Sequence, residues 1–534
     1  MKASTKENSL AIPRAETAEE VGVDSREVQS FIDECLNDGI ELHSIMVVRH
    51  GKVACEAFRE PYSPNIPHMM YSVSKSFTST AIGFAIDEGY MSLETKFLDV
   101  FPELRPTKFD EYLDKLNVFH LLTMQGGKSV SPMCDRTKDT WLQDFVDSPW
   151  AFEPGTEFLY ISENMYVLCA MIHRLTGMSV TEFLTERLYE PLGMDVPYWE
   201  TCPRGIEAGG WGLFLKTEDL AKFALCYLQH GVYNGKQVIP EWWTVDGTKK
   251  IADNSPKSDG DIDSMNGYGY CFWRNGGYEN SYRADGMFSQ FGIVFEDLDA
   301  VVAINGGNIN ESQARAAVWN HFPKAFIDDN ADSDGVKISI KPYDKLPKAP
   351  RSFLEDSLNN RRLVFGKAHV LTVLGMPVSV LPLAAVFMEK DKAGNISNVR
   401  FNFRDEDMIL TWSEGDETNT ISVGMDGEYR YDNIVLGGIA YTTAAIAAWT
   451  SENVLEVQIR PVETIAERRL VFRFKDGNKV TMEPSTLPPS STMLDNVKDS
   501  VKHIIASQAV GELASKVIPL ANPFADPVHN GTIR

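Results

Sequence analysis

The sequence predicts an α+β chain in two parts: a larger domain built on an antiparallel sheet, followed by a smaller β-rich domain. Near the N-terminus, a helical pattern is followed by a strand pair and then by an apolar helix. Beyond about residue 353, short strands recur between polar turns. With 534 residues, the chain is also too long for one ordinary hydrophobic core.

The elements of the larger domain follow from local patterns. Apolar residues at helical spacing predict a helix over residues 25–36. Two strands are expected around the tight turn at His50-Gly51, and a buried helix is expected to begin near Ser72. Apolar strands at residues 268–273, 281–286, 291–295 and 300–305 would complete the same sheet.

Composition divides the chain further. We expect an N-terminal tail over residues 1–24, the α+β domain over 25–330, a linker over 331–352, a β sandwich or barrel over 353–490, and a C-terminal helix and tail over 491–534. Residues 370–388 are apolar enough to resemble a membrane span. Because Gly375, Pro377 and Pro382 interrupt them, buried strands are favoured.

The charge and cysteine content exclude several classes of function. Asp plus Glu outnumber Lys plus Arg by 75 to 51, which argues against a nucleic-acid partner or an anionic membrane partner. The seven cysteines are scattered without a Cys-x-x-Cys pair, so neither disulfides nor a zinc site is expected. Reduced thiols, together with an N-terminus that lacks an apolar secretory segment, predict a cytoplasmic protein.

Ser72 and Lys75 are the first candidate catalytic pair. They are three residues apart, so on a helix both side chains lie on one face, one turn apart. A neighbouring ammonium and a helix N-terminus both favour the alkoxide that develops when a serine attacks, and Lys75 could relay the proton. Taken alone, the pair is a weak signal, and a helix start that carries a solvated lysine explains it more simply.

Tyr160 is the next candidate. A turn at Pro154-Gly155 leads into the loop that presents it, and an apolar helix follows. A tyrosine beside a lysine can have a lowered pKa and serve as a general base toward a serine, whereas the alternative is a half-buried loop aromatic. Further on, Gly209-Gly210 permits close backbone approach without the pattern of a phosphate loop.

Taken together and in this order, the pieces between about Ser44 and Asn305 resemble the serine beta-lactamase-like hydrolases, which include class C beta-lactamases, penicillin-binding proteins, esterases and D-aminopeptidases. The resemblance implies a beta-lactamase/transpeptidase-like fold in which Ser72 is the acyl-forming nucleophile. Lys75 and Tyr160 would exchange its proton, and the backbone N–H groups of Ser72 and Met287 would form the oxyanion hole. No metal and no organic cofactor are implied.

The tyrosine motif departs from the family's Tyr-x-Asn pattern. Here it reads Tyr160-Ile161-Ser162, so Ser162 takes the place of the amide unless Asn164 swings in. This longer form is similar to that of the nylon-oligomer-hydrolase and esterase branch.

The third motif departs further. The family places a Lys or His before Thr or Ser and Gly, to hold a substrate carboxylate, whereas this chain has Ala284-Asp285-Gly286. The lack of that cation favours neutral or amine-bearing esters and amides. Asp285 could attract a substrate ammonium, or it could pair with Arg283.

The sequence therefore predicts a serine hydrolase that acts on a small-molecule carboxylic ester or amide. A D-amino-acid peptidase or an amide-oligomer hydrolase is the nearest alternative. A catalytically idle sensor or binding module, and an enzyme that transfers its acyl group to an alcohol or amine, are the others. The β-rich domain would shape or cover the site.

Overall fold

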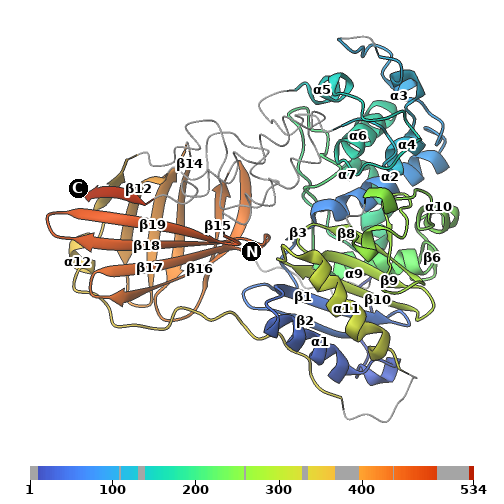
Figure 1. The fold of residues 1–534 in the computed structure, drawn as a ribbon. Helices are drawn as coiled ribbons and strands as arrows, with labels where there is room; N and C mark the ends of the chain where they lie inside the picture. Colours follow the sequence, from blue (N-terminus) through green and yellow to red (C-terminus); the bar gives the residue numbers. More distant parts are fainter. Residues whose placement is uncertain are drawn as a thin grey trace. The chain divides into compact units, whose positions relative to one another are not determined.

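The computed structural model describes residues 10–107, 110–129, 139–257, 260–327, 335–366, 396–415, 417–436, 438–489 and 528–534. These residues form two compact units, and the boundary between Lys341 and Pro342 lies within the predicted linker. Figure 1 shows the course of the chain through both units.

The first unit is built on a six-stranded antiparallel sheet. Its strand order is β2-β1-β10-β9-β8-β7, so the first hairpin lies beside the last strands of the unit. The strands are β1 (Leu42–Arg49), β2 (Lys52–Phe58), β7 (Trp273–Arg274), β8 (Ser281–Gly286), β9 (Gln290–Phe295) and β10 (Ala300–Gly306). The predicted hairpin and the three predicted strands after residue 280 are confirmed.

The predicted strand over residues 268–273 is wrong for most of its length. Only Trp273 belongs to a strand there, and Tyr268 makes isolated bridges. Gly269 donates its N–H to the carbonyl of Phe272, and Cys271 adopts a left-handed φ of 65°. The segment is therefore a tight turn, across which the rings of Tyr268 and Trp273 pack edge to face.

Helices cover both faces of this sheet. One face packs against α1 (Ser25–Asn37) and α11 (Glu311–Ala325), where residues such as Val47 and Val302 join a common apolar core. The other face packs against α9 (Thr217–Leu228), and Gly292 of β9 lies so close that an added Cβ would be 3.0 Å from Leu220 of that helix. The alternation of side chains along the strands thus matches the two helical layers.

A largely helical region carries the Ser72 segment. The short helix η2 (Tyr71–Val73) leads directly into α2 (Ser74–Asp87), which is buried along most of its length and packs against α6 (Glu163–Thr176). The other α-helices of this unit are α3 (Phe97–Val100), α4 (Val118–Leu122), α5 (Trp141–Asp147), α7 (Val180–Leu184), α8 (Glu190–Leu192) and α10 (Glu241–Gly247). Short strand pairs are formed by β3 (His68–Met69) with β4 (Phe214–Leu215), and by β5 (Val232–Tyr233) with β6 (Lys236–Gln237).

The second unit is a barrel-like sheet of ten strands among the described residues. The order is β14-β13-β12-β11-β20-β19-β18-β17-β16-β15, and a pairing of β14 with β16 brings the two ends of the sheet together. The strands are β11 (Arg362–Phe365), β12 (Ile396–Phe403), β13 (Asp407–Glu414), β14 (Glu417–Gly424), β15 (Arg430–Leu436), β16 (Ile439–Ser451), β17 (Val454–Pro461), β18 (Glu467–Lys475), β19 (Lys479–Leu487) and β20 (His529–Ile533). A short helix, α12 (Glu355–Leu358), precedes them.

The barrel corrects one expectation about the C-terminus. Residues 529–533 were expected to lie in a tail, but they form β20, which pairs with both β11 and β19. The reason is that a strand needs partners, and these partners lie far away in the sequence. The apolar residues 370–388 and the expected helix after residue 491 fall outside the described residues. Among the described residues, no helix combines the length and the apolar character needed to cross a membrane.

Candidate active site

Ser72 lies at the point where β3 gives way to helix. The backbone N–H of Met70 donates to the carbonyl of Leu213 at 2.8 Å. This bond joins the residue before η2 to the residue before β4. Tyr71 then adopts a left-handed φ of 46°, an uncommon conformation for a bulky residue. Ser72 follows in η2, half-buried, while its neighbours Tyr71 and Val73 are buried. The turn therefore leaves the serine accessible on an otherwise packed segment.

Lys75 is buried and lies directly beside Ser72. Its Nζ is 2.8 Å from Ser72 Oγ, 3.0 Å from Ser162 Oγ and 2.7 Å from the carbonyl oxygen of Gly210. The carbonyl can only accept, whereas each hydroxyl can either donate or accept. A neutral amine can therefore donate to Gly210 and Ser162 while its lone pair accepts the proton of Ser72.

The surroundings of Lys75 favour that neutral form. Burial lowers the pKa of its ammonium to about 7, against weaker opposing effects from Cys271, Glu163 and Asp285. At neutral pH a large fraction of the amine is then unprotonated and able to act as a base.

The glycine pair predicted to allow close approach does so. An added Cβ on Gly209 would lie 2.6 Å from Cys169 Sγ, and one on Gly210 would lie 2.8 Å from Ser162 Cβ. The carbonyl oxygens of both glycines accept hydrogen bonds from α2, from Thr78 at 2.9 Å and from Lys75 at 2.7 Å. The pair thus brings backbone acceptors to the lysine, which side chains at these positions would prevent.

Tyr160 lies beside Lys75 and Ser72, although the pKa of its hydroxyl differs from the prediction. Its ring centroid is 4.8 Å from Lys75 Nζ, and its ring packs 5.2 Å from that of Trp273. Burial raises its pKa well above the usual value, against a lowering by its hydrogen bond with Ser72. The predicted lowering of the pKa is therefore wrong, because desolvation of the phenolate outweighs the help from its neighbours. Tyr160 is a neutral hydroxyl at physiological pH.

Ser162 and Asn164 lie in different surroundings. Ser162 contacts Lys75, as described above, and occupies the position next to the amine. Asn164 is fully buried on α6, where its Nδ2 is 3.7 Å from Met124 Sδ and its Oδ1 would be 2.9 Å from a Cβ on Gly126. The structure therefore places Ser162, and not Asn164, in contact with the lysine.

The end of β8 comes close to the start of η2. An added Cβ on Gly286 would lie 2.2 Å from the carbonyl oxygen of Met70, so only glycine allows this approach. Met287, the next residue, is 42% exposed and begins the turn into β9. Ser72 lies two residues after Met70, in the first turn of η2, and the N–H groups of a first helical turn have no acceptor within the helix.

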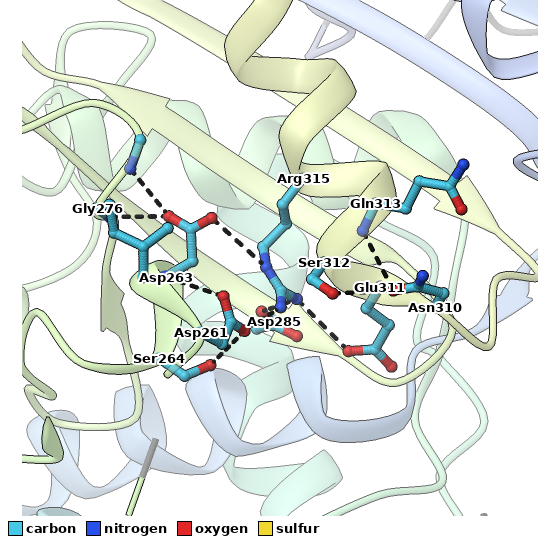
Figure 2. A network of polar contacts seen from close by, with 12 residues as sticks. Asp261, Asp263, Ser264, Gly276, Asp285, Asn310, Glu311, Ser312, Gln313 and Arg315 are labelled. Atoms are coloured by element: carbon cyan, nitrogen blue, oxygen red, sulfur yellow. Dashed lines mark hydrogen bonds and ion pairs between the residues drawn. The ribbon is translucent and has the colours of Figure 1, made fainter. Parts of the chain in front are cut away.

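Asp285 is engaged by a neighbouring side chain. Arg283 Nε donates to Asp285 Oδ2, and Arg315 Nη1 lies 4.0 Å from the same oxygen. Figure 2 shows Asp285 beside Arg315, within a larger group of carboxylates. The ion pair with Arg283, which the sequence left as one of two alternatives, is therefore present.

Several neighbours of the site were missed in the sequence. Trp273 and Cys271 come from the turn that was expected to be a strand, and Cys271 donates its Sγ–H toward Met165 Sδ at 3.3 Å. Glu311 lies on α11 and reaches the turn after β8. No local motif marks any of the three, because they reach the site only through the packing of distant segments. In the part of the chain that the structure describes, no cluster of His, Cys, Asp or Glu could hold a metal ion.

Comparison with known proteins identifies the family of the chain. The family model described as Beta-lactamase matches residues 28–318, which is more than half of the chain. The chain belongs to the beta-lactamase family. The match covers the sheet, Ser72, Lys75, Tyr160 and the turn after β8, so the resemblance that these motifs indicated is confirmed.

The sequence identity between this chain and individual members of the beta-lactamase family is low. The chain is 27% identical over 222 residues to 6-aminohexanoate-dimer hydrolase of Paenarthrobacter ureafaciens, covering 38% of this chain and 55% of that protein. It is 26% identical over 164 residues to a D-aminopeptidase of Brucella anthropi, covering 28% of this chain and 31% of that protein. The chain thus spans about half the length, or less, of these relatives. A solved family VIII carboxylesterase matches with a TM-score of 0.47 and 16% identity over 59% of this chain and 98% of that one.

Proposed function

We propose that this chain is a serine hydrolase that cleaves a carboxylic ester or amide through an acyl-enzyme on Ser72. The observation that carries the proposal is the 2.8 Å contact between Ser72 Oγ and a buried Lys75 whose pKa is lowered to about 7. A solvated lysine beside a helix start would be exposed and charged, whereas Lys75 is buried and contacts three oxygen partners. The named relatives, which include a 6-aminohexanoate-dimer hydrolase and a D-aminopeptidase, support the same class of reaction.

Acylation begins with a proton transfer. Ser72 Oγ attacks the substrate carbonyl carbon while its proton passes to the neutral amine of Lys75. The carbonyl oxygen becomes an oxyanion, which accepts hydrogen bonds from the backbone N–H groups of Ser72 and Met287. The tetrahedral intermediate then collapses, the bond to the leaving group breaks, and the leaving oxygen or nitrogen takes up a proton.

Tyr160 supplies that proton by relay. Its hydroxyl is neutral because burial raises its pKa, and it is hydrogen-bonded to Ser72. It can donate its proton to the leaving group while it accepts one from the Lys75 ammonium, so it carries the proton without a stable phenolate. In deacylation, water attacks the acyl carbon and the same groups take its proton; they return it to Ser72 Oγ as the acyl–oxygen bond breaks, which releases the acid and restores the serine.

The substrate is a small molecule that needs no carboxylate to be recognised. Arg283 is 1% exposed and is engaged by Asp285 and Asn275, so it cannot reach a substrate anion. Beside the lysine lies the ring of Tyr160, whose centroid is 5.2 Å from that of Trp273, and the Trp273 ring in turn packs 6.1 Å from that of buried Phe158. Such a surface suits the apolar acyl or alkyl part of an ester or amide.

The test is a labelling and turnover experiment on wild type and Ser72→Ala. Wild type should gain the mass of one adduct after exposure to a fluorophosphonate and should hydrolyse a short-chain nitrophenyl ester, whereas Ser72→Ala should do neither. Ser79→Ala, which changes a buried serine further along α2, is the matched control and should label like wild type.

Two other outcomes would redirect the proposal. If wild type neither labels nor turns over, the idle binding module becomes the better explanation. If wild type labels but adding an alcohol or amine diverts the acyl group from water to that acceptor, the chain is an acyltransferase that uses the same residues. Product analysis by mass spectrometry separates hydrolysis from transfer.

A further inference from the structure

The turn after β8 is held in a conformation that its own residues disfavour. Phe288 and Ser289 have φ angles of 66° and 71°, in the left-handed region, although neither is glycine. Both are buried, and they directly follow Met287, whose N–H is one of the two proposed oxyanion donors. A non-glycine backbone in this region persists only where its surroundings over-determine it. The contacts that do so are therefore contacts that position the oxyanion hole.

Hydrogen bonds from side chains and from the backbone hold the turn at both the N–H and the carbonyl of Phe288. The carboxylate of Glu311 accepts the N–H of Phe288 at 2.7 Å. The carbonyl oxygen of Phe288 accepts from the N–H of Asn308 at 3.1 Å and from the side-chain amide of Gln290 at 3.2 Å. Because the N–H of Phe288 belongs to the peptide that follows Met287, fixing its direction also fixes the backbone on the carboxyl side of Met287.

The turn also packs against the segment that carries the nucleophile. The ring of Phe288 meets the ring of Tyr71 edge to face, with centroids 5.0 Å apart and planes at 70°. Tyr71 has a left-handed φ as well and immediately precedes Ser72. The two strained residues next to the two proposed N–H donors therefore contact each other, so a shift of one would shift the other.

Glu311 is itself held in place by an ion pair with Arg315. It lies in the first turn of α11, and its Oε2 is 3.6 Å from Arg315 Nη1, one turn along the same helix. Figure 2 shows Arg315 between Glu311 on one side and Asp261 and Asp263 on the other. Arg315 therefore orients the Glu311 carboxylate, one oxygen of which is left to accept from the turn.

We infer that Glu311 is a positioning residue for the oxyanion hole, acting through the N–H of Phe288 and never touching the substrate. The inference rests on the proposed function. Because it concerns only the stabilisation of the oxyanion, its signature lies in the chemical step: removing the acceptor should lower kcat and kcat/KM together and leave KM nearly unchanged.

Three variants test this role by nitrophenyl ester hydrolysis. Glu311→Ala removes the acceptor and should lower kcat by about 10- to 100-fold, somewhat less than the loss of an oxyanion donor itself. Glu311→Gln keeps an oxygen acceptor of the same reach and should recover most of kcat. Asp261→Asn is the matched control: it removes a charged partner of the same arginine without contacting the turn, and its kcat should stay within about twofold of wild type.

The alternative outcomes are distinct. Equal losses in Glu311→Ala and Asp261→Asn, or a raised KM with unchanged kcat, would overturn the positioning role, as would a Glu311→Ala variant with wild-type kcat. If Glu311→Ala fails to fold by circular dichroism, Glu311→Met, which fills the same space without an acceptor, replaces it in the comparison with Glu311→Gln. A wild type that neither labels nor turns over would contradict the proposed function itself, so the two failures cannot be confused.

Discussion

For a single residue, burial decides what Lys75 can do. Its spacing from Ser72 could be read in the sequence, since three residues on a helix place two side chains on one face. Its lowered pKa could not, because that depends on the packing of α2 against α6 and on the glycine pair. The same limit explains the wrong prediction for Tyr160: the neighbouring lysine was visible in the pattern, but the burial that outweighs it was not.

The pH dependence of turnover should therefore follow Lys75. Below about pH 7 its amine is protonated and cannot accept the proton of Ser72, so kcat/KM for an uncharged ester should rise with pH and level off above that value. Tyr160 should add no second limb near neutrality, because its pKa is raised out of that range. A pH-rate profile tests this, and a flat profile between about pH 5.5 and 8.5 would exclude Lys75 as the base.

Among the elements, those whose turns are local were predictable and those with distant partners were not. The hairpin at His50-Gly51 and the helix over residues 25–36 are set by neighbouring residues. By contrast, β20 forms only because β11 and β19 flank it, and the turn at Cys271 replaces an expected strand. The barrel was expected only as one of two β architectures, since strand patterns do not reveal how a sheet closes.

The barrel encloses an ion pair whose stability depends on both partners. Arg468 on β18 makes two hydrogen bonds to Glu414 on β13, at 2.6 and 2.8 Å, and Glu414 is fully buried. Arg468→Met should destabilise the barrel by about 3 to 5 kcal/mol, because it leaves Glu414 buried without its cation. Adding Glu414→Gln should recover most of that loss, since the uncharged amide still accepts from Trp412.

Urea unfolding of the wild type, the single variant and the double variant measures both effects. Arg473→Met, at an exposed pair on the same strand, is the control and should change the free energy of unfolding by less than about 1 kcal/mol. A double variant no more stable than Arg468→Met would show that shape, and not charge, is the cause.

For the molecule as a whole, acid should act on the first unit through a buried histidine pair. His68 Nε2 is 3.0 Å from His43 Nδ1, and the ring of Tyr62 stacks on His43 at 4.0 Å. Burial, together with the neighbouring histidine, lowers the pKa of His68 to about 3. Between about pH 6.5 and 3 the unfolded chain therefore binds a proton that the folded chain does not, so stability falls as the pH falls.

This effect should amount to at most about 1.4 kcal/mol for each pH unit below 6.5. Thermal unfolding of wild type and His68→Gln at a series of pH values isolates it, because all other titrating groups are common to both proteins. The variant should lose less stability than wild type between about pH 6.5 and 4.5, whatever its stability at neutral pH. Parallel curves would assign the acid sensitivity to other groups.

The close approach of Gly286 to Met70 limits how this site can be altered. The carbonyl of Met70 cannot turn away from an added Cβ, since it also accepts the N–H of Val73 at the start of the helix that carries Ser72. Any side chain at position 286 would thus part the two segments that carry the proposed N–H donors. In a mutagenesis library screened for new substrates, this position should tolerate glycine alone, and useful diversity has to come from the residues on either side of it.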